Sequence, residues 1–136
     1  MTIVLDTNIL LVAIARNSNL HLIFQELIRQ KYVLAVSTEI LLEYEEILQR
    51  KLSTEAATNI MILLSNLPNL RKIDTHFLWG MIEKDWDDNK FVDCAVAAGA
   101  TYIVSDDAHF RVLKKIDFPP LDLLTGQEFV EVLKKK

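Results

Sequence analysis

The chain has 136 residues, of which 51% are hydrophobic and 25% are charged, so a disordered chain is excluded and we expect one domain over residues 1–136. The single cysteine, Cys94, excludes an internal disulfide. The net charge of −4 argues against a protein that binds nucleic acid through a broad positive surface. It does not exclude an enzyme that acts on nucleic acid with the help of bound cations. We recognise no signal peptide and no apolar run near the ~20 residues of a membrane span, so we expect a cytoplasmic protein without membrane contact.

Apolar runs and helical periodicities alternate along the chain. In chain order, we predict strands over residues 2–5, 32–36, 70–73, 101–104 and 121–123. We predict helices over residues 9–13, 20–28, 37–50, 53–65, 88–99 and 107–115, and a last helix that begins at the capping box 125–128. Residues 75–83 fit either a helix or an extended segment. Strands that alternate with helices indicate an α/β fold with a parallel sheet and right-handed crossovers.

Two of the predicted strands end in an aspartate. Asp6 follows the apolar run 3–5, and Asp106 follows the run 102–104 after one serine. Because ligands of parallel sheets bind beyond the carboxyl ends of the strands, both carboxylates should lie at one edge. Carboxylates held together repel unless a proton or a cation lies among them. The sequence therefore predicts a divalent metal site, and a metal site favours hydrolysis.

Helical phase sorts the other acidic residues. At about 100° per residue, Asp88 lies at the N-terminal end of the stripe with which the 88–99 helix packs on the sheet. Asp93 lies about 140° away from Asp88, and we interpret it as solvent-facing or supporting. In the 37–50 helix, Glu43 and Glu45 lie on the two shoulders of the buried face, and periodicity does not choose between them.

Four segments, in this order and spacing, resemble PIN domains. They are Val4-Leu5-Asp6-Thr7-Asn8, Leu41-Leu42-Glu43-Tyr44, Asp87-Asp88-Asn89-Lys90-Phe91 and Tyr102-Ile103-Val104-Ser105-Asp106. The third segment is similar, more narrowly, to bacterial toxin components of toxin–antitoxin systems, the VapC-like ribonucleases. Trp86 stands where that family usually has a proline. The resemblance covers nearly the whole chain and implies a three-layer α/β/α sandwich with a mainly parallel central sheet of about five strands.

The resemblance also implies a catalytic set, and it selects Glu43 over Glu45. The implied catalytic residues are Asp6, Glu43, Asp88 and Asp106, of which Asp6, Asp88 and Asp106 would hold one or two Mg²⁺ or Mn²⁺ ions. All-oxygen ligands suit these hard cations. The expected supporting residues are Thr7, Asn8, Ser105, Asp107 and Asp93. Arg16 and Lys90 are candidate contacts to RNA, because Arg16 follows the first helix and Lys90 is close to Asp88.

The function implied is that of a metal-dependent endoribonuclease that hydrolyses RNA phosphodiester bonds as the toxin of a toxin–antitoxin pair. We expect RNA as substrate, an antitoxin protein as partner, and a homodimer. The alternative is a PIN-fold module that binds RNA or protein with little or no nuclease activity. An aspartyl-phosphate phosphatase would need an aspartate where Asn8 stands, and a receiver domain would need one after the middle strand, where Ser37 stands.

Overall fold

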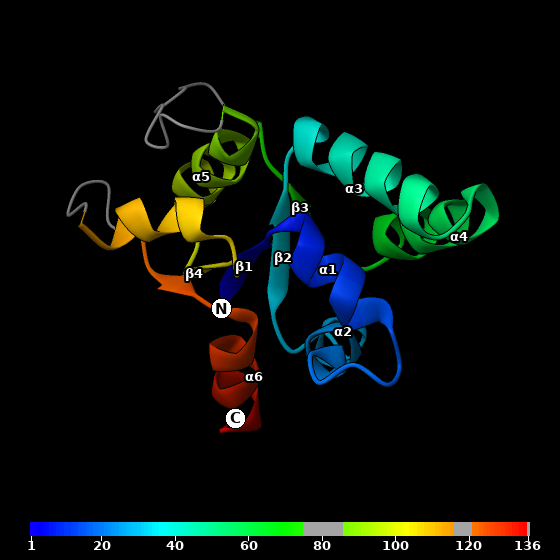
Figure 1. Ribbon diagram of the computed structural model, residues 1–136, viewed down its shortest axis with the longest axis horizontal. Coiled ribbons are helices and arrows are strands. Elements are labelled where there is room, and N and C mark those ends of the chain that lie inside the picture. The colour runs from blue at the N-terminus through cyan, green and yellow to red at the C-terminus, as the bar shows by residue number, and fades with distance from the viewer. Residues whose placement is uncertain (75–85, 116–120, 136) are drawn as a thin grey trace.

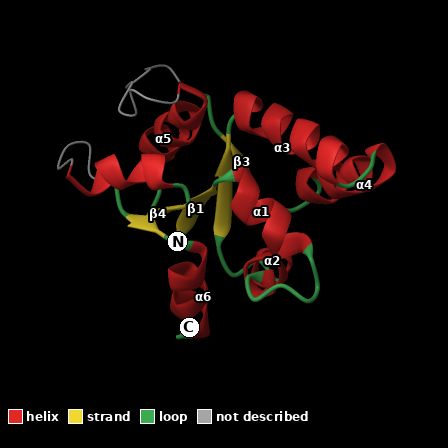
Figure 2. Cartoon of the chain, viewed as in Figure 1, coloured by secondary structure: helices red, strands yellow, loops and turns green. Residues whose placement is uncertain are grey.

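The fold is built around a parallel sheet (Figures 1 and 2). The computed structural model describes residues 1–74, 86–115 and 121–135, with residues 86–88 and 112–115 described by their backbone alone. In this part of the chain, five strands are ordered β3-β2-β1-β4-β5. They are β1 (Thr2–Leu5), β2 (Val33–Val36), β3 (Leu70–Lys72), β4 (Tyr102–Val104) and β5 (Leu123–Leu124). Every neighbouring pair is parallel, which confirms the predicted sheet.

Helices connect the strands. They are α1 (Thr7–Ile14), α2 (His21–Ile28), α3 (Thr38–Lys51), α4 (Thr54–Ser65), α5 (Trp86–Ala98), the 3₁₀ helix η1 (Ala108–Lys115) and α6 (Gly126–Lys134). The chain steps from β1 to β2 to β3 in one direction and from β3 back to β4 and β5 in the other. Right-handed crossovers therefore place α1 to α4 on one face of the sheet and α5 on the other. This arrangement confirms the three-layer α/β/α sandwich (Figure 1).

Several helix ends follow from single residues. Ser37 and Ser53 accept hydrogen bonds from the backbone N–H groups of Ile40 and Ala56, so they begin α3 and α4 as predicted. Thr125 begins α6 with the predicted capping box. The helix α5 ends before Gly99, whose φ of 61° is the left-handed conformation that glycine adopts readily.

Some boundaries differ from the prediction. The helix α5 begins at Trp86, two residues before the expected Asp88. Residues 108–115 form a 3₁₀ helix, where an α-helix was expected over 107–115. The last strand covers 123–124, whereas 121–123 was expected. The segment 75–83, which fitted either structure, lies outside the described residues.

The core lies on both faces of the sheet. Residues of β1, β2 and β4 pack against α5, whose Phe91, Val92, Cys94 and Ala95 are all buried. Burial of an aromatic or branched side chain contributes roughly 1.5–3 kcal/mol, so α5 is strongly held against the sheet. Among the described residues, no helix combines the length and the apolar character that a membrane crossing requires.

Candidate functional site

The site begins where β1 and β4 end side by side. Leu5 pairs with Val104 in the parallel ladder, and the backbone N–H of Asp6 donates to the Val104 carbonyl at 3.0 Å. This register places Asp6 next to Ser105. The strand order reverses between β1 and β4, since β2 follows on one side and β5 on the other. Such a switch point is where parallel sheets open a crevice for ligands.

Asp6 is a buried carboxylate. Its residue is 6% exposed, and its Oδ2 accepts a hydrogen bond from Ser105 Oγ at 2.7 Å. Burial raises the pKa of Asp6 above its ordinary value, and the charges of Glu43 and Asp107 raise this pKa further. The Ser105 hydroxyl and the Thr7 backbone N–H act in the opposite direction, because they bond the ionised form. Asp6 is therefore held in one orientation within an environment that favours a cation beside it.

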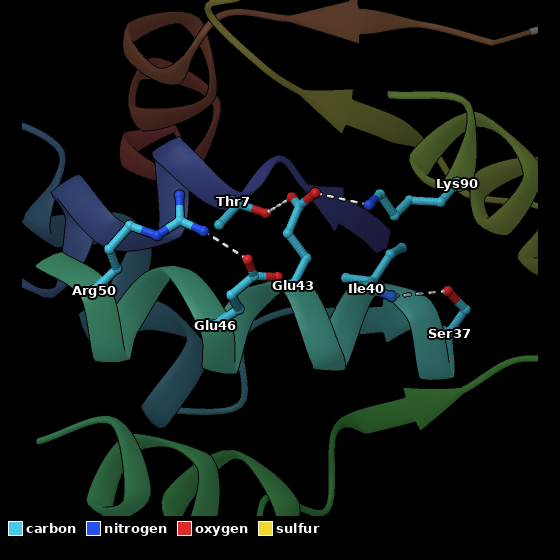
Figure 3. Close-up of polar contacts among 7 residues, drawn as sticks. All are labelled: Thr7, Ser37, Ile40, Glu43, Glu46, Arg50 and Lys90. Atoms are coloured by element: carbon cyan, nitrogen blue, oxygen red, sulfur yellow. Dashed lines mark hydrogen bonds and ion pairs between the residues drawn. The ribbon is translucent and has the colours of Figure 1, made fainter. Parts of the chain in front are cut away.

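Glu43 is fixed through both carboxylate oxygens (Figure 3). Thr7 Oγ1, at the start of α1, donates a hydrogen bond to Oε2. Lys90 Nζ, from α5, lies 2.7 Å from Oε1. The side chains of Lys90 and Glu43 are only 20% and 22% exposed. Side chains from three helices therefore meet at the carboxylate of Glu43, which was predicted from the sequence to belong to the same site as Asp6.

Ser105 connects Asp6 to the residues that follow β4. Its Oγ donates to Asp6 and accepts a hydrogen bond from the backbone N–H of Asp107 at 3.0 Å. Asp107 Oδ1 in turn accepts from the backbone N–H of His109 at 2.9 Å. Asp107 is half-buried, and its charge raises the pKa of Asp6. The turn after β4 therefore brings Asp107 toward the buried carboxylate.

Asp106 takes a different position from the one expected. The sequence placed it beside Asp6 as the fourth acid, but in the structure it is exposed and its Oδ1 accepts from the backbone N–H of Gly126 at 2.9 Å. Gly126 is the first residue of α6, so this bond satisfies an unpaired donor at a helix N-terminus. Consecutive residues after a strand point in different directions, which fits the bond of Asp106 to Gly126 and the effect of the Asp107 charge on the pKa of Asp6.

The remaining predicted residues differ in their burial and in whether their side chains are described. Asp88 lies in the first turn of α5, but its side chain is outside the described part of the chain. Asn8 is exposed in the first turn of α1. Asp93 is 5% exposed, which excludes the solvent-facing alternative and leaves its role as a supporting residue a prediction. The reason is that α5 is covered on several sides, by the sheet and by α3, so a single-stripe reading of its phase failed.

Arg16 is not brought to the acidic residues. It follows the C-terminal end of α1, whereas Asp6 precedes the N-terminal end, and a helix of this length spans about 12 Å. Arg16 lines a hollow of about 330 Å³ with Ile14, His21, Phe24 and Ile28. The hollow therefore belongs to the α1–α2 end of the molecule, and no described carboxylate lines it.

The donor set fits a hard cation in its chemistry. Asp6, Glu43 and Asp107 carry only carboxylate oxygens in their side chains, and oxygen atoms of this kind suit Mg²⁺ or Mn²⁺. Within the described residues, no three acidic, histidine or cysteine side chains are close enough together to hold a metal as they stand. The side chain of Asp88, which the sequence predicts as a metal ligand, lies outside the described part of the chain. The fit of the site to a cation therefore rests on two observations. Asp6 is buried, and the nearby charges of Glu43 and Asp107 repel its ionised carboxylate.

The sequence did not predict the roles of two residues near the site, Lys90 and Asp107. Lys90 was expected to contact RNA, and its pairing with Glu43 was not foreseen. Asn89 is 3% exposed, although its amide is polar. A polar pair in the first turns of an otherwise apolar helix was the available signal, because buried polar groups need partners. Asp107 was expected only as a supporting residue, because the family resemblance placed the fourth acidic residue at Asp106.

Comparisons with known proteins agree with the geometry. Residues 2–109 match the model of a family described as PIN domain. The fold is similar to a crystal structure of VapBC2 from Rickettsia felis bound to a DNA fragment from its promoter, with a TM-score of 0.64, 22% identity, and coverage of 92% of this chain and 98% of that one. It is also similar to Mycobacterium tuberculosis VapC20, a toxin that cleaves the sarcin–ricin loop, with a TM-score of 0.54, 16% identity, and coverage of 83% and 94%. No curated protein matches the sequence.

Proposed function

Because the chain belongs to the PIN domain family, we propose that it is a metal-dependent endoribonuclease and the toxin component of a toxin–antitoxin pair. The observation that carries this proposal is the buried Asp6 carboxylate at the β1–β4 switch point, with Glu43 and Asp107 close enough to raise its pKa. A buried carboxylate beside two others is costly without a cation, and such arrangements are kept at functional sites.

We propose Asp107, in place of Asp106, as the fourth acidic residue of the site. The carboxylate of Asp106 is used by Gly126 at the start of α6, while Asp107 is the residue after β4 whose charge acts on Asp6. We therefore propose Asp6, Asp88 and Asp107 as the residues that hold one or two Mg²⁺ or Mn²⁺ ions. Glu43 borders them, and Asp106 supports the fold of α6.

The chain's own residues prepare the site for hydrolysis. Ser105 orients Asp6, and Thr7 and Lys90 orient Glu43, so two carboxylates are fixed before any ligand arrives. A bound Mg²⁺ or Mn²⁺ supplies Lewis-acid chemistry, which favours a nucleophilic water and stabilises the leaving oxygen of a phosphodiester. The residues around Asp6 limit the access of bulk water, which strengthens electrostatic interactions in the site.

The partners follow from the proposed role. The relative from Rickettsia felis is a VapBC2 assembly, and by analogy we propose an antitoxin partner for this chain. VapC20 is a toxin that cleaves the sarcin–ricin loop, and by analogy we propose RNA as the class of substrate here. Because the net charge is −4, RNA binding should depend on cations in the site and on a few basic residues.

A pair of neighbouring variants tests the assignment. Asp107→Asn should abolish Mn²⁺-dependent cleavage of a mixed RNA and weaken Mn²⁺ binding. Asp106→Asn is the matched control, because it changes the adjacent carboxylate without touching Asp6. It should keep cleavage and lower stability by about 0.3–1 kcal/mol at most, because asparagine can still accept from the Gly126 N–H and only the negative charge at the start of α6 is lost. Loss of cleavage in Asp106→Asn with retention in Asp107→Asn would reverse the assignment.

A second function is a PIN-fold module that binds RNA or protein without cutting. The pairing of Glu43 with Lys90 favours it, because a carboxylate held by an ammonium group is not available as it stands to a cation. Under this alternative, RNA or partner binding would be the same with and without Mn²⁺, and wild-type protein would leave RNA intact.

A further inference from the structure

The ion pair between Lys90 and Glu43 is more sheltered from solvent than the other ion pairs among the described residues, because both of its side chains are mostly buried. Its two side chains are 20% and 22% exposed, whereas those of Arg50 and Glu46, one turn further along α3, are 61% and 64% exposed. Figure 3 shows Glu43 and Glu46 on the same helix, α3, with Lys90 reaching Glu43 from α5. Water and salt screen the Arg50–Glu46 pair, so it contributes little, while the sheltered pair is screened much less.

The sheltered pair also joins elements that are far apart in the sequence. Lys90 belongs to α5 and Glu43 to α3, so their contact crosses from one helical layer to the other at the strand ends. Thr7 holds the second oxygen of the same carboxylate. Glu43 therefore has one orientation only while Lys90 is in place, and Lys90 brings a positive charge to the group formed by Asp6, Glu43 and Asp107.

We propose that Lys90 is a positioning residue that fixes Glu43 and acts as the internal counter-charge of the acidic site, in competition with a divalent cation. The inference rests on the proposed function, because it assigns a role within the same site. It replaces a role for Lys90 as a simple phosphate contact. The ammonium group lowers the affinity of the site for a second positive charge, and it keeps Glu43 in the orientation that turnover needs.

This proposal gives two opposite effects for one substitution. Replacing Lys90 by a neutral side chain makes the site more negative, so Mn²⁺ should bind about three- to tenfold more tightly. The same change releases one of the two contacts that orient Glu43, so kcat at saturating Mn²⁺ should fall about tenfold or more. The KM for RNA should stay the same, because no phosphate contact has been removed.

The experiment measures Mn²⁺ binding and RNA cleavage separately. The dissociation constant of Mn²⁺ alone is obtained by electron paramagnetic resonance of the free ion, with wild-type protein, Lys90→Met and Lys90→Arg. Lys90→Arg keeps the positive charge, so its Mn²⁺ affinity should stay close to that of the wild type. Arg50→Met is the matched control, because it removes an equal charge and an ion pair from α3 at an exposed position. It should change neither the Mn²⁺ affinity nor kcat.

The outcomes separate this inference from the function on which it rests. Tighter Mn²⁺ binding in Lys90→Met, with a lower kcat and an unchanged KM, supports the inference. Unchanged or weaker Mn²⁺ binding in a folded Lys90→Met protein overturns it, as does a rise in KM alone, which would identify an RNA contact. A wild-type protein that binds Mn²⁺ but cuts no RNA refutes the proposed nuclease, while the Mn²⁺ titrations still decide the role of Lys90. A wild-type protein that binds no Mn²⁺ refutes both.

Discussion

The hydroxyl group of Tyr44 links helix α3 to the strand end that carries Asp6. Tyr44 is fully buried, and its hydroxyl donates a hydrogen bond of 2.6 Å to the Leu5 carbonyl. Tyr44→Phe removes this bond and leaves the ring in place. A buried bond of this kind contributes about 1 kcal/mol, and the carbonyl left behind costs somewhat more, so we expect a loss of about 1–2 kcal/mol of unfolding free energy. For a chain of this size, that is roughly 3–6 °C in the melting temperature.

The chain provides a matched control for this prediction. Tyr32 is 2% exposed, and its hydroxyl donates to the Ile23 carbonyl at 2.7 Å, at the opposite end of the parallel strands from Asp6. Tyr32→Phe should lose a similar amount of stability in urea unfolding monitored by circular dichroism. Only Tyr44→Phe should weaken Mn²⁺ binding, because only Tyr44 holds the backbone next to Asp6 and directly follows Glu43 on the same helix.

Two results would refute this reasoning. A loss below about 0.3 kcal/mol for Tyr44→Phe would mean that the hydroxyl contributes nothing net to folding. An equal loss of Mn²⁺ affinity in both variants would mean that affinity follows global stability and not the position of Asp6.

The remaining predictions concern the charge, the thiol and the surface of the protein. Burial raises the pKa of Asp6 in the folded protein, so its ionisation lowers stability as the pH rises from the unfolded pKa, about 3.9, through the folded value. In metal-free buffer, Asp6→Asn should therefore be more stable than wild type at pH 7 but not below about pH 4, and equal stability at pH 7 would contradict the buried charge. Burial raises the pKa of Cys94 to about 12, so a thiol reagent should label Cys94 only in the unfolded protein, and rapid labelling of native protein would contradict its place in the core. Leu42 and Ile62 are 62% and 54% exposed, and we expect such apolar side chains to be covered in a homodimer, so light scattering should give about twice 15.6 kDa at micromolar concentration, whereas a 15.6 kDa species would reject the dimer.

The order of the elements could be predicted because local signals determine it. Ser37, Ser53 and Thr125 cap helices through their own side chains, and Gly99 ends one, so the boundaries follow from the chemistry of single residues. The α5 helix was harder, because it is buried on more than one side. Periodicity assumes one apolar stripe, and it therefore left a solvent-facing position open for Asp93, which the structure shows to be buried.

The sequence could predict only those residues of the candidate site that directly follow a strand. Asp6 follows directly from the end of a buried strand, and the register with β4 places Ser105 beside it. Which of Asp106 and Asp107 turns toward Asp6 depends on the loop after β4 and on the distant backbone N–H of Gly126. The Lys90–Glu43 pair depends on the tertiary packing of two helices, which sequence spacing does not contain.

The most direct test of the central claim is cleavage of a mixed RNA by wild-type protein and by Asp6→Asn, with and without Mn²⁺. We expect wild-type cleavage that requires Mn²⁺ and is abolished by chelation. We expect Asp6→Asn to fold, because asparagine can keep the hydrogen bond from Ser105, and to leave the RNA intact. Cleavage by Asp6→Asn at the wild-type rate, or wild-type cleavage that persists without divalent cations, would contradict a metal-dependent site built on Asp6.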